Sequence, residues 1–422
     1  FFCHGDDKKN DVTWLPAMSR ENAEVEISGA WDVTEYNTVT GEIYTPAYEI
    51  RNGKTVLKYT LFGEDSVLLR LKKSNENSKK VEGDKKKKLL PLKCADVSLS
   101  AQDMRTEYKE VADGVPYTMD EPNVILLDMA EYAFDGEEYL PEVDSIHIGD
   151  IGRARFYKGF EEQSQVQPWV PVPEELKNDK GHTVKRRFTF ESEIDIENAC
   201  LALEMSDVAE IYINGKKIDK VFDGWYVDEC IKKVHLPKLP KGKVTVEITT
   251  PFTLRGRTEW VYVLGDFGVR VEGRRVIACP GKQTLDFGDI TRQTLPFYTG
   301  NITYHTAYTE TEGKTRTLQI PAFGGALVRV SVDGRDAGVI AVSPYCADLG
   351  FLEKGEHRID ITLFGTRFNG FGPLHNMYSK DNPAHGGWLT RGPGSWRTYG
   401  CPAWNDAYQL NSAGILSCPT VY

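Results

Sequence analysis

The chain has 422 residues, of which 40% are hydrophobic, 27% charged and 11% aromatic, as is typical of a globular protein. Because single hydrophobic cores stop growing at about 250–300 residues, this length predicts several domains. The formal net charge of −11 would repel a phosphate backbone, and no apolar run approaches the roughly 20 residues of a membrane-spanning helix. We therefore expect neither a nucleic-acid partner nor a membrane partner.

Residues 1–71 predict a small β-sandwich. Trp31, Val33 and Tyr36 lead into the turn "NTVTGE", and the stretch "NGKTVLKYTLFGEDSVLLRL" supplies a hairpin turn followed by two further strands. Residues 72–90 contain the polar, aromatic-free run "KKSNENSKKVEGDKKKK". Such a run cannot bury enough apolar surface to order itself, so it predicts a linker.

Residues 91–273 predict the first of two tandem jelly-roll β-sandwiches, which makes the expected fold all-β. The stretch "EPNVILLDMAEYAFDGEEY" indicates a buried strand that leads to an Asp135-Gly136 turn. Long helical patterns are scarce, and Ser145 to Tyr157 is the best short candidate for a helix.

Residues 274–422 predict a second jelly roll, because they repeat part of the first. "AEIYINGKKI" at 209–218 matches "VRVSVDGRDA" at 328–337, and each alternates apolar and polar residues before an Asn-Gly or Asp-Gly turn. At the same offset of 119 residues Tyr226 falls on Tyr345, and an "L..L.KG" loop follows in both copies. The repeat is domain-sized, which indicates a duplicated sandwich rather than a solenoid.

The cysteines and histidines give no sign of a metal site. The eight cysteines lie far apart without a CxxC pair, and the eight histidines form neither HExxH nor HxH. Mostly buried, reduced thiols are the simplest interpretation, and they favour a soluble protein of a reducing compartment such as the cytoplasm. The chain begins Phe1-Phe2-Cys3 rather than with Met, which predicts a piece of a larger protein, so its location cannot be read from this end.

No cofactor can be assigned from the sequence. No GxGxxG pattern follows a strand, which argues against nucleotide binding. Calcium stays open, because oxygen ligands on sandwich loops leave no fixed spacing.

Catalytic residues cannot be assigned either. Glycoside hydrolysis needs two carboxyl groups about 5–10 Å apart, and no spacing along the chain selects such a pair. The acids in suggestive positions are Glu121, Asp128, Glu131, Glu259 and Asp266. An acid beside a turn is more often solvated or caps a loop, so we expect structural roles for them. For His305 and His375 we likewise favour a hydrogen-bonded loop position over a contact with a sugar hydroxyl.

The stretch 380–406, "KDNPAHGGWLTRGPGSWRTYGCPAWND", is the best candidate for a carbohydrate-binding site. Flat aromatic rings stack on the apolar face of a sugar, and planar polar side chains satisfy its hydroxyls. The candidate residues are Trp388, Trp396, Trp404, Arg391 and Arg397. The alternative, which we favour slightly, is that these tryptophans fill an interface between domains.

A second aromatic set consists of Trp225 in "DGWYVDE" and Trp169 in "VQPWVPVP". Tyr226 recurs as Tyr345 in the second copy, which indicates a role in the fold. Trp225 is specific to the first copy, since Pro344 occupies the matching position. Packing in the core or at the rim is our first interpretation of Trp225, and sugar binding is the alternative.

Several phrases resemble the carboxy-terminal part of large bacterial glycoside hydrolase-like proteins. They are "VAEIYINGKKID", "DGWYVDECIKKVHLPKLPKGKVTVEIT", "EWVYVLGDFGVRVEG", "LPFYTGNITYH" and "DITLFGTRFNGFGPLHN". Such proteins carry galactose-binding-like jelly rolls similar to the sugar-binding domains of glycoside hydrolase family 2, in an architecture similar to the family 106 α-L-rhamnosidases. The resemblance covers most of residues 90–422. It implies that residues 1–71 follow a catalytic (β/α)₈ barrel lying upstream of Phe1.

No segment alternates strands with helices of about 10–15 residues, as a barrel would. The resemblance therefore implies a non-catalytic carboxy-terminal portion of a glycoside hydrolase that acts on polysaccharide. Its partners would be carbohydrate and the upstream catalytic domain of the same polypeptide. Two alternatives remain: a stand-alone carbohydrate-binding or adhesion protein, and an enzyme such as a lyase with its site on the sandwiches. The sequence does not show which sugar or linkage is involved, or whether hydrolysis would be retaining or inverting.

Overall fold

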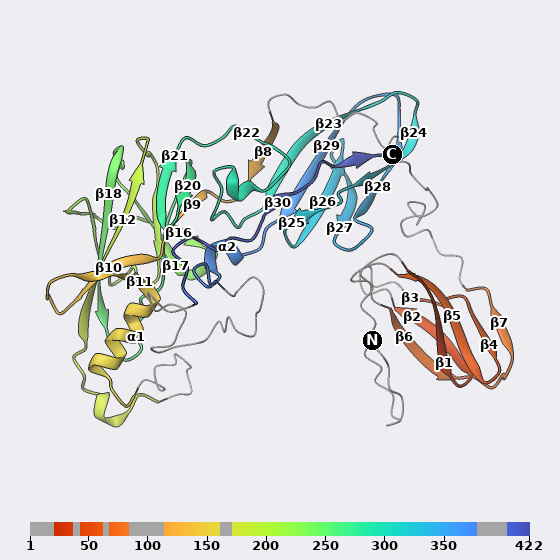
Figure 1. Cartoon of the computed structure of the whole chain (residues 1–422), viewed down its shortest axis with the longest axis horizontal. Coiled ribbons are helices and arrows are strands. Elements are labelled where there is room, and N and C mark those ends of the chain that lie inside the picture. The colour runs from red at the N-terminus through yellow and green to blue at the C-terminus, as the bar shows by residue number, and fades with distance from the viewer. Residues whose placement is uncertain (1–20, 37–42, 62–66, 84–113, 161–170, 378–402) are drawn as a thin grey trace.

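The computed structural model describes residues 21–36, 43–61, 67–83, 114–160, 171–377 and 403–422 (Figure 1). These residues form an all-β protein of mainly antiparallel sheets packed as sandwiches, as the alternating sequence pattern predicts. No helix within the described ranges has the length and apolar character needed to cross a membrane.

The first unit is a small sandwich of two sheets. One sheet has the order β1 (Glu21–Ser28), β5 (Lys54–Leu61), β4 (Tyr48–Arg51) and β7 (Lys79–Val81). The other has the order β3 (Ile43–Tyr44), β2 (Trp31–Tyr36) and β6 (Leu68–Lys73). Their core is the buried cluster Val33, Tyr48, Ile50 and Leu57.

Part of the expected linker belongs to this small sandwich. Strand β7 lies within residues 72–90 and pairs with β4, Tyr48 opposite Val81. The polar composition is misleading because an edge strand needs few apolar residues, and here Val81 alone of the strand packs against the core.

The second unit is a larger sandwich with its own core. One sheet has the order β11 (Leu140–Asp144), β10 (Met129–Phe134), β12 (His182–Ser192), β18 (Gly242–Phe252), β14 (Glu210–Ile213) and β15 (Lys216–Lys217), with β21 (Arg275–Cys279) pairing β12 and β20 (Gly268–Glu272) pairing β21. The opposing sheet has the order β16 (Phe222–Tyr226), β17 (Asp228–His235), β13 (Cys200–Leu203), β19 (Val261–Gly265) and β9 (Asn123–Leu127). Residues such as Phe188, Val246 and Val263 are fully buried between the two sheets.

The third unit is another sandwich. Its main sheet has the order β22 (Thr284–Leu285), β8 (Val115–Met119), β23 (Ile302–Glu310), β29 (Gly355–Phe364), β26 (Leu327–Val332) and β27 (Arg335–Ile340). Facing it are β28 (Cys346–Leu352), β24 (Lys314–Gln319) and β31 (Thr420–Val421), and β25 (Phe323–Gly324) pairs with β30 (Gly414–Ile415).

The structure confirms the repeat. The strands β12-β18-β14-β15 of the second unit have the same order and antiparallel pairing as β23-β29-β26-β27 of the third. Both predicted turns have positive φ at the two central residues: +47° and +78° at Asn214-Gly215, and +49° and +78° at Asp333-Gly334. Asn and Gly tolerate this left-handed backbone, which matches the twist of a hairpin.

Helices are short. The sequence prediction for Ser145 to Tyr157 is confirmed by α1 (Ser145–Phe156), whose first amides are capped by the Asp144 carboxylate. The others within the described ranges are α2 (Phe368–Phe371) and two 3-10 turns, Glu174–Leu176 and Ile290–Arg292.

Two segments lie on the opposite side of the expected boundary between the jelly rolls. Strand β8 precedes the second unit in the chain but pairs with β23 of the third, Tyr117 opposite Tyr304. In the reverse sense α2 and residues 403–410 pack against the core of the second unit, and Figure 1 shows α2 beside β16 and β17. The two larger sandwiches therefore exchange chain segments, which a division at a single residue does not describe.

Candidate functional site

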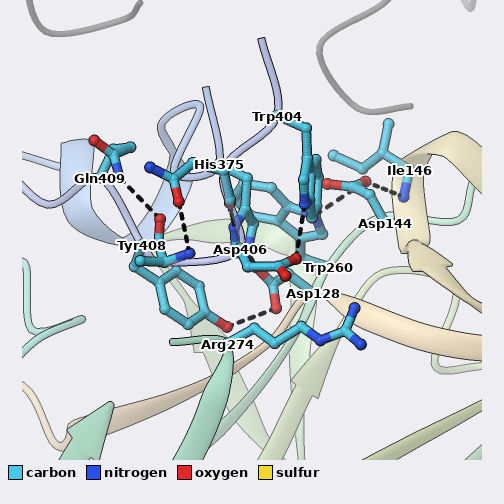
Figure 2. Close-up of polar contacts among 12 residues, drawn as sticks. Asp128, Asp144, Ile146, Trp260, Arg274, His375, Trp404, Asp406, Tyr408 and Gln409 are labelled. Atoms are coloured by element: carbon cyan, nitrogen blue, oxygen red, sulfur yellow. Dashed lines mark hydrogen bonds and ion pairs between the residues drawn. The ribbon is translucent and has the colours of Figure 1, made fainter. Parts of the chain in front are cut away.

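A buried carboxylate, Asp128, organises the place where the carboxy-terminal segment meets the second unit (Figure 2). Asp128 joins β9 to β10, and its backbone carbonyl accepts a 2.7 Å hydrogen bond from the Ser145 amide at the start of α1. Its two carboxylate oxygens face His375 Nε2 at 3.1 Å and the Tyr408 hydroxyl at 2.9 Å. A buried carboxylate needs such partners, because transfer from water is costly without them.

The surroundings of His375 favour its imidazolium form. Its ring is fully buried, with Nε2 facing Asp128 and Nδ1 lying 2.6 Å from the carbonyl oxygen of Asn405. Both neighbours are acceptors, so both ring nitrogens donate. Burial opposes the charged form, but the hydrogen bond and charge of Asp128, with the Asn405 carbonyl, outweigh it and raise the pKa of His375 above its ordinary 6.5.

Trp404 lies on top of this histidine. The two rings are stacked with centroids 4.4 Å apart and planes 16° from parallel, and the indole Nε1 donates a 3.0 Å hydrogen bond to Asp406. A cation under the indole face is favourable because of the ring quadrupole. Trp404 is only partly buried, and its orientation is fixed by the histidine below it and by Asp406.

Two more charged side chains lie near Asp406, the hydrogen-bond partner of the indole. Glu142 at β11 forms an ion pair with Arg274 at 3.2 Å, and each side chain is 36% exposed. The pKa of Glu142 is raised above its ordinary value, and burial is the largest cause. The positive charge of Arg274 lowers this pKa, whereas the charges of nearby acids, including Asp128 and Asp406, raise it further. In Figure 2 the Arg274 side chain runs below Asp128, and its guanidinium points away from Asp128 and Asp406. An oriented ring beside paired carboxyl and guanidinium groups can bind the apolar face and the hydroxyls of a sugar.

A second tryptophan lies deeper in the same corner. Trp260 is 4% exposed and its Nε1 is 3.4 Å from Asp144, the carboxylate that caps α1. It is therefore a packing residue that connects the loop before β19 to the start of the helix.

Of the predicted sugar-binding residues, Trp404 is the one that the described structure places at this corner. Trp388, Trp396, Arg391, Arg397 and Trp169 lie outside the described residues. The chain positions on either side of residues 378–402 meet here, because the Met377 amide donates a 2.8 Å hydrogen bond to the Ala403 carbonyl.

Trp225 lies elsewhere. It belongs to β16, and Asp128 follows β9, which are the opposite edges of one five-stranded sheet. This ring is not packed in the core: it is 53% exposed, because β16 is an edge strand, and Phe222 on the same strand is 44% exposed. The neighbouring Tyr226 is 3% exposed and packs against Tyr262 and Phe371, as a role in the fold requires.

Two of the other acids named from the sequence have cationic partners. Glu131 pairs with Arg187 at 2.7 Å, and Glu121 forms a two-pronged contact with Arg367. Glu259 offers its backbone carbonyl, at 2.7 Å, to the fully buried guanidinium of Arg186.

Sequence reasoning missed Glu142, Arg274 and Tyr408. These residues come from β11, from the turn between β20 and β21, and from the carboxy-terminal segment. They come together only through strand pairing and through the packing of the carboxy-terminal segment on the second unit, so no local sequence motif indicates them. His375 and Asp128 were named from the sequence, although not as partners of each other.

Known proteins give weak likenesses. No family profile and no curated protein matches the sequence. Similar solved structures include a rhamnosidase from Novosphingobium sp. PP1Y (17% identity, TM-score 0.24, 58% of this chain and 23% of that one). Others are a Streptomyces avermitilis α-L-rhamnosidase complexed with L-rhamnose (11%, 0.24, 82% and 35%) and a β-galacturonidase from Eisenbergiella tayi bound to glycerol (8%, 0.22, 60% and 37%). The chain spans less than half of each of these glycosidases, and TM-scores of this size carry no residue role or activity over to it.

Proposed function

We propose that this chain is an accessory, non-catalytic portion of a glycoside hydrolase that acts on polysaccharide, and that the Trp404 corner binds carbohydrate. The corner consists of Trp404, Asp406, Glu142 and Arg274. The observation that carries the proposal is the half-exposed indole of Trp404, stacked on His375 and hydrogen-bonded to Asp406 beside the Glu142–Arg274 pair.

This arrangement lowers the cost of binding, because the ring is already fixed in the absence of ligand. A flexible aromatic side chain would lose about 0.5–1.5 kcal/mol of rotamer freedom when a sugar stacks on it. Trp404 has lost that freedom in the fold. A single stacked ring with a few hydroxyl contacts, worth about 4–6 kcal/mol in total, corresponds to dissociation constants from millimolar to high micromolar.

A second candidate surface is the exposed pair Phe222 and Trp225 on β16. Lys232 lies over the Phe222 ring at 5.8 Å, so this edge also offers an aromatic face beside a charged group. It would suit a stand-alone carbohydrate-binding or adhesion protein equally well. The two surfaces lie at opposite edges of one sheet and can be tested separately.

The test is a titration of the full chain with neutral and uronate-containing oligosaccharides, followed by NMR. We expect Trp404→Ala and Arg274→Gln to weaken binding while the fold is retained, and Trp404→Phe to keep part of it. Trp225→Ala is the matched control, since it removes an indole from the other edge. Undiminished binding by Trp404→Ala, or loss in Trp225→Ala alone, would exclude the Trp404 corner.

We expect the chain to leave aryl glycosides and oligosaccharides intact, because Asp128, Glu131 and Glu121 are held in structural contacts. Asp128, for example, has partners at both carboxylate oxygens. Product formation can be followed by absorbance and chromatography. Turnover that co-purifies with the protein and disappears with a single Asp or Glu substitution would contradict the non-catalytic assignment.

A further inference from the structure

Three potential metal ligands meet on the sheet that contains β16, β17 and β13. Cys200 begins β13, His235 ends β17 and Asp223 lies in β16. One potential ligand atom from each side chain can be chosen so that all three lie within 4.8 Å of one another. Cys200 Sγ is 3.6 Å from His235 Nδ1, and His235 Nε2 is 4.0 Å from an Asp223 carboxylate oxygen.

Strand pairing produces this arrangement. Cys200 and His235 are direct cross-strand partners, and β16 lies on the other side of β17. Side chains directly opposite each other on one face of a sheet have Cβ atoms about 5 Å apart, which suits a shared ion. The ligands are far apart along the chain, so no zinc-type spacing appears in the sequence.

The three side chains also differ usefully in exposure. Cys200 is 9% exposed, whereas His235 and Asp223 have side chains 51% and 54% exposed. The sulfur therefore forms the floor of the cluster, and solvent reaches the other two groups.

We propose that Cys200, His235 and Asp223 bind a thiophilic divalent ion of the zinc type, with water completing a tetrahedron. Zinc takes cysteine sulfur at about 2.3 Å, and histidine nitrogen or carboxylate oxygen at about 2.0–2.2 Å. Ligand atoms around such an ion lie roughly 3.3–3.6 Å apart, so the three atoms of the cluster, which lie within 4.8 Å of one another, must move slightly closer. Only one nitrogen of the His235 ring can coordinate the ion. A small rotation of that ring or of the Asp223 carboxylate therefore brings the three ligand atoms around it.

Binding releases one proton. Burial raises the pKa of the Cys200 thiol, and the charge of Lys233 opposes this effect. The thiol therefore carries a proton before the ion binds. The ion replaces this proton, which passes to solvent. The proton therefore competes with the ion for the Cys200 sulfur.

One cation already lies beside the cluster. Lys233 Nζ is 3.4 Å from the same Asp223 carboxylate. It competes for this ligand, and its charge repels a metal ion. Replacement by a neutral side chain should therefore tighten metal binding, whereas a purely structural cluster would gain nothing from it.

Cobalt(II) is the probe, because thiolate coordination to it produces a charge-transfer band in the near ultraviolet. Titration of the metal-free full chain should produce this band at one equivalent, and added zinc should abolish it. We expect Cys200→Ser to remove the band and His235→Gln to weaken cobalt binding by roughly tenfold or more, since loss of even an outer partner costs 10–100-fold. Lys233→Gln should strengthen it.

Cys279→Ser and Cys230→Ser are the matched controls and should bind cobalt as the parent does, with circular dichroism confirming the fold of every variant. A band that persists in Cys200→Ser would assign the metal to another thiol and overturn the proposal. The absence of any thiolate band in the parent chain would overturn it as well.

Discussion

At the scale of single residues, Gly215 and Gly334 show how strongly backbone geometry constrains the repeated hairpins. Both have a φ of +78°, and a Cβ added at either position would meet no atom within 4 Å. Any cost of substitution is therefore backbone strain rather than a clash. We expect Gly215→Val and Gly334→Val each to lower the free energy of unfolding by about 1–3 kcal/mol, measured by chemical denaturation.

The matched control for these variants is Gly215→Asn, because Asn tolerates the left-handed region far better than a β-branched residue. It should cost clearly less than valine at the same position. Equal effects of Val and Asn would show that something other than φ governs these turns.

His375 gives a residue-scale prediction about pH. Its pKa is raised in the folded protein, so the fold binds the proton more tightly than the unfolded chain does. The resulting stabilisation is fully present below about pH 6.5, the unfolded value, and is lost as pH rises through the folded pKa. His375→Gln should remove this dependence.

Urea unfolding of the parent and of His375→Gln, measured at about pH 6 and about pH 9, tests this expectation. The difference in unfolding free energy between the two proteins should be larger at the lower pH. If the difference is the same at both values, the proton on His375 does not contribute to stability.

At the scale of elements, helix α1 depends on one carboxylate. Asp144 accepts a 2.8 Å hydrogen bond from the Ile146 amide and also lies near Trp260. We expect Asp144→Ala to lower the free energy of unfolding by about 0.5–2 kcal/mol, the usual cost of an N-cap. Asp144→Asn keeps a capping oxygen and should cost much less in the same denaturation experiment. Equal losses in the two variants would show that the charge of Asp144, rather than its capping hydrogen bond, stabilises the helix.

The elements differ in how far the sequence could predict them. The hairpins around Asn214 and Asp333 and the helix from Ser145 are encoded locally, in alternation, turn residues and a cap, so they were predictable. The partner of a strand is not encoded locally. Nothing in "VPYTM" indicates that β8 joins β23 rather than β9, because the choice depends on contacts made much later in the chain.

The candidate site was predictable only in part, for the same reason. Trp404 was predicted because its indole lies in a Gly/Pro-rich stretch. Nothing in the sequence near Glu142 or Arg274 indicates a binding site. The same holds for Cys200, Asp223 and His235, which become neighbours through strand register alone.

At the scale of the whole molecule, the larger sandwiches share chain segments and the small one does not. Among the described residues, the core cluster of the small sandwich includes no residue that follows Val81 in the chain. Residues 403–422 supply β30 and β31 to the third unit and Tyr408 to the Asp128 site of the second. We therefore expect a chain shortened to residues 84–422 to keep the unfolding midpoint of the larger sandwiches.

A chain that ends at residue 402 should instead unfold at lower temperature and less cooperatively, because both larger units lose contacts. Differential scanning calorimetry of the two shortened chains and the full chain makes the comparison. An unchanged transition after loss of residues 403–422 would show that the exchanged segment contributes nothing to either unit.

The early position of β8 also affects the order of events during synthesis. Its partner β23 follows about 180 residues later, so at roughly 5–20 residues per second a ribosome needs on the order of 10–40 s to deliver it. Meanwhile the nascent chain carries an unsatisfied strand edge that could recruit a neighbouring chain. Pro116, the second residue of β8, lacks an amide hydrogen and so removes one donor from the unpaired strand during the wait.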